Sequence, residues 1–166
     1  MGFLSSMNLF SKKAVEPKEN KQVSEEDVML QLHTGEISLK DVPDQTKAIC
    51  LTAVKSDGEA LQYVKEQTPE ICLAAVRAYG SALRFVRKQT SEICLAAVQT
   101  QGLALRWVWD QTPEICLAAV KQNGGALEFV REQTLDICSE AVLSNSAAYD
   151  YIDDPEMYEK CKSLFG

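Results

Sequence analysis

The strongest constraint on this chain is an internal repeat, because residues 45–154 divide into five contiguous units of 22 residues. A gap-free register of this kind predicts one small structural unit stacked repeatedly on itself. Position 1 of each unit is a glutamine, namely Gln45, Gln67, Gln89, Gln111 or Gln133. The units read QTKAICLTAVKSDGEALQYVKE, QTPEICLAAVRAYGSALRFVRK, QTSEICLAAVQTQGLALRWVWD, QTPEICLAAVKQNGGALEFVRE and QTLDICSEAVLSNSAAYDYIDD.

Each unit carries signals that start and end a helix. In the second unit, Thr68 suits the N-cap, Pro69 suits the first helical position, and Glu70 favours the positive end of the helix dipole. The helix is expected to run to about Tyr79. Gly80 is then expected to take the left-handed conformation that closes many helices.

A second, shorter helix is predicted over residues 81–88, which makes each unit a helical hairpin. In the first helix, apolar residues at positions 5, 6, 7, 9 and 10 occupy most of the circumference. A helix so broadly apolar needs cover on several sides, which a stack of hairpins provides. The predicted fold is therefore all-α, an α-solenoid of stacked short helical hairpins.

The ends of the array are expected to be degenerate caps on a single helical-repeat domain, residues 23–166. Residues 23–44 align as an N-terminal cap unit, and residues 155–166 supply a C-terminal cap helix after the five repeats. Ser139 and Glu140 replace Leu and Ala at positions 7 and 8 of the last unit. These substitutions are expected to turn one side of that unit towards water, as terminal repeats require.

Residues 1–22 match no unit and contain Ser, Lys, Glu, Asn and Pro, which predicts a flexible tail. Its first residues fit a myristoylation pattern on Gly2, and Lys12 and Lys13 would supply a second membrane signal. Membrane binding is expected only if Gly2 is myristoylated. The alternative interpretation is an unstructured leader with a weakly amphipathic apolar segment.

The composition is that of an ordinary globular protein, with 46% apolar and 25% charged residues, which disfavours disordered and membrane-spanning classes. The formal net charge is -7, and it argues against general nucleic-acid binding because duplex affinity depends on Lys and Arg. The six cysteines come without an apolar signal-peptide core. A reducing, cytoplasmic location is therefore expected.

The unit TPEICLAAVKQNGGALEFVREQ resembles a repeat family of unknown function found in bacterial and large-virus proteins. The shared motif is a block of the form EICLAAVKQNG followed by Ala, Leu, an aromatic residue and Val. The resemblance covers residues 45–154, is closest over residues 113–133 and weakens in both caps. It implies helical repeats and supplies no catalytic residue, substrate or partner.

Three regular columns of residues are interpreted as structural. Cysteines at position 6 suggest metal or redox chemistry, but equivalent atoms of stacked helices lie roughly 8–10 Å apart, beyond zinc or disulfide geometry. They and the aromatic residues at position 19 are predicted to be core, whereas Cys161 is expected to be more exposed. The acids at position 4 stabilise helix dipoles. The columns are Cys50, Cys72, Cys94, Cys116 and Cys138; Tyr63, Phe85, Trp107, Phe129 and Tyr151; and Glu70, Glu92, Glu114 and Asp136.

No catalytic motif is recognisable, so the chain is predicted not to be an enzyme and to need no metal or cofactor. The only histidine, His33, has no Cys, Asp or Ser motif around it that marks a catalytic partner. The sequence contains no P-loop, no HExxH, no CxxC and no nucleophile elbow.

Positions that vary between units are the candidates for recognition, because the regular positions are needed for stacking. Positions 13, 15, 18, 21 and 22 vary most, and the second and third units fill them with basic and aromatic residues between acidic ends. Trp109 is the sharpest candidate because it replaces a cation of other units, and Trp and Arg are enriched in interface hot spots. The alternative is a solvated face. The predicted partner-binding residues are Tyr79, Arg84, Arg87, Lys88, Leu103, Arg106 and Trp109.

These features favour a non-enzymatic protein that binds another protein through the outer face of its second helices. A second hypothesis is a virus- or phage-encoded inhibitor of a host defence or nucleic-acid enzyme, with its acidic ends mimicking nucleic acid. A third is direct binding of RNA or single strands at Arg84, Lys88, Arg106 and Trp109.

Overall fold

The computed structural model describes residues 23–166. The predicted flexible tail, residues 1–22, and the myristoylation pattern on Gly2 lie outside the described residues. Within the described range all regular elements are helices, and no helix there is long and apolar enough to cross a membrane.

The first element of each unit is a ten-residue α-helix that begins where the sequence predicts. The threonine at position 2 is its N-cap in all five units, and its side chain accepts a hydrogen bond from the amide of the isoleucine at position 5. The α-helices are α1 (Glu25–Thr34), α2 (Lys47–Ser56), α3 (Pro69–Ala78), α4 (Ser91–Thr100), α5 (Pro113–Gln122), α6 (Leu135–Ser144) and α7 (Pro155–Phe165).

The second element differs from the prediction, because it is a short 3₁₀ helix and ends earlier. In the second unit it spans Gly80–Phe85 instead of residues 81–88, and Val86 is already extended. A 3₁₀ helix has three residues per turn, so Gly80 and Leu83 lie on one face and are both buried, and the extended Val86 is buried just after the helix. The 3₁₀ helices are η1 (Leu39–Asp41), η2 (Gly58–Tyr63), η3 (Gly80–Phe85), η4 (Gly102–Trp107), η5 (Gly124–Phe129) and η6 (Ser146–Tyr151).

The predicted left-handed conformation of Gly80 is wrong. In the described chain only Gly35 has a positive φ, and α3 ends at Ala78 and is followed by Tyr79 in an extended conformation. Gly80 is needed because the next unit comes too close for a side chain. A Cβ on Gly80 would lie 2.6 Å from the carbonyl oxygen of Ala97 in α4. The glycine therefore sets the spacing between units instead of ending a helix.

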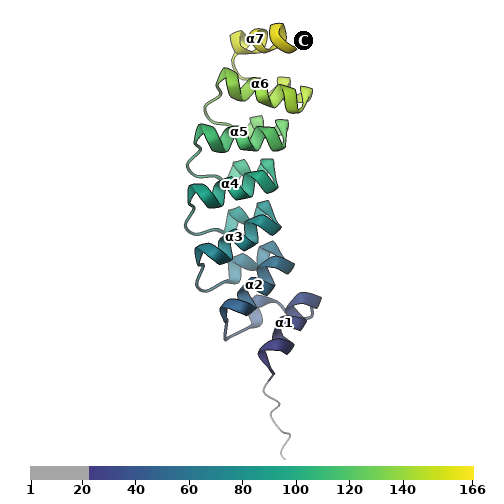
Figure 1. Ribbon diagram of the computed structural model, residues 1–166, viewed down its shortest axis with the longest axis vertical. Coiled ribbons are helices and arrows are strands. Elements are labelled where there is room, and N and C mark those ends of the chain that lie inside the picture. The colour runs from purple at the N-terminus through teal and green to yellow at the C-terminus, as the bar shows by residue number, and fades with distance from the viewer. Residues whose placement is uncertain (1–22) are drawn as a thin grey trace, which may run out of the picture.

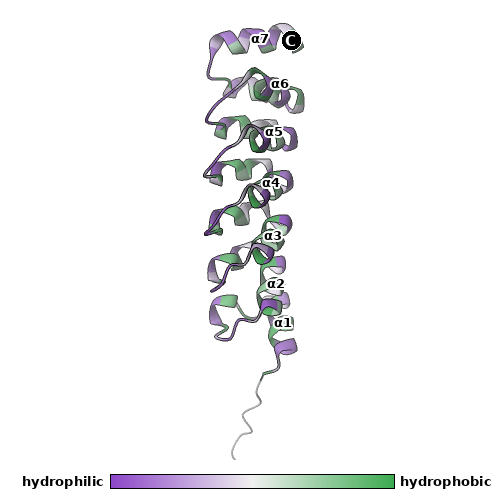
Figure 2. Ribbon diagram, turned by 60° about the vertical axis from the view of Figure 1, so that its left-hand side comes forward, coloured by the Kyte–Doolittle hydropathy of each residue, from purple (hydrophilic) through white to green (hydrophobic). Residues whose placement is uncertain are grey.

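The units stack into an elongated α-solenoid, as predicted (Figure 1). Each α-helix packs on the α-helix of the next unit, and the 3₁₀ helices pack on one another in the same order. The chain therefore has a layer of α-helices and a layer of 3₁₀ helices. The connecting loops gather along one edge, at the left of Figure 1, and most of their residues are hydrophilic (Figure 2).

The core lies between the two layers and runs the length of the stack. In the second to fourth units, the α-helices bury positions 5, 6, 9 and 10. The second half of each of these units buries positions 16, 17 and 20, and Leu105, at position 17, is 0% exposed. Burial of the five repeat cysteines is confirmed. The aromatic column is not fully core, since Phe85, Trp107 and Phe129 are half-buried and Tyr63 and Tyr151 are exposed.

The C-terminal end corrects two further expectations. Cys161 is buried, not exposed, because α7 packs on α6 and brings the Cys161 Sγ to 3.9 Å from the Ser139 Oγ. Ser139 is therefore half-covered by α7 instead of facing water. Glu140 is also half-buried and lies 3.8 Å from the Lys121 ammonium.

Candidate functional site

The loops between units form one edge of the solenoid, which we call the loop edge. It consists of residues 42–46, 64–68, 86–90, 108–112, 130–134 and 152–154. The short turns between each α-helix and its 3₁₀ helix lie at the opposite end of the α-helices. A ten-residue α-helix is about 15 Å long, so the two edges are separated by about that distance.

The glutamine at position 1 holds each loop in place. In the third unit, the Gln89 Nε2 donates to the carbonyl of Trp107 at 2.8 Å, and its Oε1 accepts from the amide of Trp109 at 3.0 Å. The Cys94 thiol donates to the same oxygen at 3.4 Å. Sequence reasoning missed this role, although the glutamine in all five units was a visible signal. The other members of this glutamine ladder are Gln45, Gln67, Gln111 and Gln133.

The cation at position 21 clamps its unit to the unit before. The Arg87 guanidinium donates to the carbonyl oxygens of Lys65 at 3.0 Å and Gln62 at 3.4 Å. The Arg131 guanidinium donates to Trp109 at 2.8 Å and the Lys65 ammonium to Pro43 at 2.6 Å. Arg87 was predicted to face a partner, yet its charged head is bound to the backbone of its own chain.

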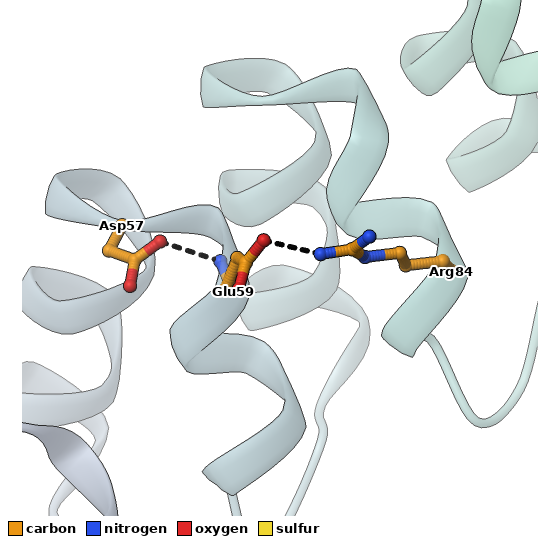
Figure 3. A network of polar contacts seen from close by, with 3 residues as sticks. All are labelled: Asp57, Glu59 and Arg84. Atoms are coloured by element: carbon orange, nitrogen blue, oxygen red, sulfur yellow. Dashed lines mark hydrogen bonds and ion pairs between the residues drawn. The ribbon is translucent and has the colours of Figure 1, made fainter.

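Two other predicted recognition residues also contact their own chain. Arg84 forms an ion pair with Glu59 of the preceding unit, and the backbone amide of Glu59 donates to the Asp57 carboxylate at 2.9 Å (Figure 3). The Arg84 guanidinium also lies 4.5 Å from the centre of the Phe85 ring.

Arg106 bridges the aromatic rings of two units. Its guanidinium lies 5.6 Å from the centre of the Trp107 ring and 4.2 Å from that of Phe129. Cation–π contacts of this kind stabilise the 3₁₀ face. The position 18 arginines therefore tie neighbouring units together while remaining at the surface.

Tyr79 and Leu103 do not join the other predicted residues at the loop edge. Tyr79 follows α3 at the opposite edge, where its hydroxyl donates to the Ser56 carbonyl at 2.8 Å. Leu103 is half-buried near the start of η4, close to that same opposite edge. The seven predicted residues therefore form no single patch.

Lys88 and Trp109 are the predicted residues that lie exposed at the loop edge with no side-chain hydrogen bond or ion pair among residues 23–166. Trp109 is 60% exposed, which confirms its predicted exposure. Val108 is extended and Trp109 follows it in the loop, where the Gln89 side chain binds its backbone amide.

Small hollows recur along the loop edge between successive units. One of about 300 Å³ lies between the first and second units and includes Cys50 and Lys65 in its lining. One of about 210 Å³ occupies the equivalent place between the fourth and fifth units, with Cys116 and Arg131 in its lining. The cation at position 21 therefore lines a hollow of side-chain size.

The cysteines at position 6, two of which line these hollows, are poor nucleophiles. Burial raises the pKa of each repeat thiol, and the pKa of Cys138 rises to about 11. Burial is the largest cause at Cys138, and the nearby Cys161, Asp153 and Asp154 raise its pKa further. The thiolate is the reactive form, so these thiols are suited to packing.

Among residues 23–166, the other chemistry-bearing residues form no recognisable catalytic site. The Nδ1 of His33 lies 3.2 Å from the Ser56 Oγ, a contact between exposed residues that the sequence did not predict. Within residues 23–166 no carboxylate binds the other ring nitrogen. In the same range no three His, Cys, Asp or Glu side chains are placed to hold a metal ion.

Comparison with protein families gives one match. A model described as a domain of unknown function (DUF4116) matches residues 46–91. The match begins at the N-cap threonine of the first unit and ends just after that of the third, so it spans the length of two units. No curated protein and no solved structure matches the chain.

Proposed function

We propose that this chain is a non-enzymatic helical-repeat protein that binds another protein through its loop edge around Trp109. One observation carries the proposal: the indole is 60% exposed although its backbone is held by Gln89. An exposed tryptophan on a rigid frame binds with little loss of conformational entropy, and Trp is enriched in interface hot spots.

The contacts that the other variable residues make within their own chain support this choice of surface. Arg84, Arg87 and Arg106 each contact their own chain, which leaves Lys88 and Trp109 as the central residues available to a partner. Direct RNA binding has less support, because Arg84 and Arg106, two of its four proposed contact residues, are already engaged within the chain. The virus-encoded inhibitor remains a hypothesis that rests on acidic charge and family resemblance.

We also propose that the whole array, residues 45–154, belongs to one repeat type shared with bacterial and large-virus proteins. The family match over two units and the identical Thr cap and Gln contacts in all five units support this extension. We further place the protein in a reducing cytoplasm, because its six cysteines are all buried as separate thiols.

The test is affinity capture from the native source, followed by binding of variants to the captured protein. Trp109→Ala should weaken binding by about tenfold or more, as truncation of a hot-spot tryptophan does. Leu143→Ala is the matched control, because Leu143 is 62% exposed on α6, outside the loop edge. Equal binding by wild type and Trp109→Ala would show that this surface is the wrong one.

A further inference from the structure

The position 21 cations form a regular ladder of contacts between units. Each donates to the backbone carbonyl of the residue 22 positions earlier, at 2.6 Å from Lys65 to Pro43, 3.0 Å from Arg87 to Lys65 and 2.8 Å from Arg131 to Trp109. The same geometry would place a donor from residue 109 on the carbonyl of Arg87. The ladder therefore defines a fourth place for a cation.

Trp109 leaves that place open. Its side chain carries a single N–H and no positive charge, and in the described chain no hydrogen bond joins it to the Arg87 carbonyl. The neighbouring units on both sides keep their cations. The third unit thus combines a carbonyl acceptor that lacks its clamp with an exposed indole face. Both features attract a cation, one by a charge-assisted hydrogen bond and the other by a cation–π contact.

The charges around the loop edge are those that a basic partner would need. Position 22 carries an exposed acid in every unit except the second, where it is Lys88, and the first turns of α3 to α6 add a second acidic column. Glu70 pairs with Lys47, whereas the position 21 cations bind uncharged backbone carbonyls, so the other acids of these columns have no ion-pair partner within residues 23–166. The acids are Glu66, Glu70, Glu92, Asp110, Glu114, Glu132, Asp136 and Asp154.

We infer that the loop edge binds a basic segment of a protein partner, with one Arg or Lys side chain completing the ladder beside Trp109. The incoming cation lies against the indole and donates to the Arg87 carbonyl, as Arg131 donates to Trp109. This inference rests on the proposed protein-binding function and specifies the chemistry of the partner. Binding of a nucleic acid would be the opposite outcome, because the acidic columns would repel its phosphates.

Indole NMR signals report on this site directly, because the chain contains two tryptophans and so gives two indole N–H signals. Trp107→Phe and Trp109→Phe assign them. The probe is an acetylated, amidated peptide of alternating Gly and Arg, and the control is the same peptide with Glu for Arg. At low salt the Arg peptide should shift the Trp109 signal saturably and the Trp107 signal less, whereas the Glu peptide should shift neither.

Trp109→Arg is the decisive variant, because its own guanidinium would occupy the open place. Its affinity for a fluorescent Arg peptide should fall about tenfold, a loss of the size expected for one cation–π contact with its hydrogen bond. Trp109→Phe should bind within about threefold of wild type, since it keeps an aromatic face. Circular dichroism shows that both variants are folded.

Three results would overturn the inference: undiminished binding by Trp109→Arg, equal binding of the Glu peptide, or a Trp109 shift with an oligouridylate as large as that with the Arg peptide. Failure of this inference is distinguishable from failure of the proposed function. A captured protein lost by Trp109→Ala but retained by Trp109→Arg would refute the basic segment and leave protein binding at this edge standing.

Discussion

The glutamine ladder offers the sharpest test of what holds each unit together. Gln89→Ala removes the hydrogen bonds to the Trp107 carbonyl and the Trp109 amide, at 2.8 and 3.0 Å. Each such bond contributes about 1 kcal/mol net, and the carbonyl of the half-buried Trp107, left without its partner, adds a desolvation cost. The free energy of unfolding should therefore fall by about 2–3 kcal/mol.

Urea unfolding followed by far-UV circular dichroism measures this loss. The matched control is Gln101→Ala in the same unit, because Gln101 is exposed and its side chain makes no hydrogen bond among the described residues. The control should change the free energy by no more than about 0.5 kcal/mol. If Gln89→Ala were as mild as the control, the glutamine would not close the loop in the way described.

Two further predictions concern the core. Leu105→Ala should lower the free energy of unfolding by about 2–5 kcal/mol, because Leu105 is fully buried. Leu95→Ala, at a half-buried site, should lower it by about half as much. Equal losses for the two variants in urea unfolding would contradict the two-layer packing. The Cys138 thiol, with its pKa raised to about 11, keeps its proton in the folded chain at a pH where the unfolded chain has lost it. Its contribution to stability should be intact below about pH 9 and lost as the pH rises through 11, so a Cys138→Ala variant should lose less stability than wild type over that range.

Helix starts were predictable because their signals are local. Thr68 accepts from the amide three residues later, and Pro69 needs no donor, so neither depends on the rest of the fold. The 3₁₀ helix was not predictable from residues 81–88, whose apolar spacing also suits an α-helix. Its early end depends on Gln67, which binds the carbonyl of Phe85 and the amide of Arg87 from 18 and 20 residues away.

The candidate site was predicted in part for a similar reason. Variability between units identified Trp109 and Lys88, which are exposed at the loop edge. It also selected Arg87, because the sequence does not distinguish an arginine that faces a partner from one that donates to the backbone of its own chain. The visible signal was a cation at position 21 in three of the five units, which marks a shared structural role. Tyr79 was misplaced because the length of α3 separates it from the loop edge.

The central claim is that position 21 clamps one unit to the next and that Trp109 interrupts this ladder. Trp109→Arg tests it most directly, since the arginine can donate to the Arg87 carbonyl as Arg131 donates to Trp109. The unfolding free energy in urea should rise by about 0.5–1.5 kcal/mol, the net contribution of a typical hydrogen bond at an exposed position. An unchanged or lower stability would contradict the ladder and, with it, the open place beside Trp109.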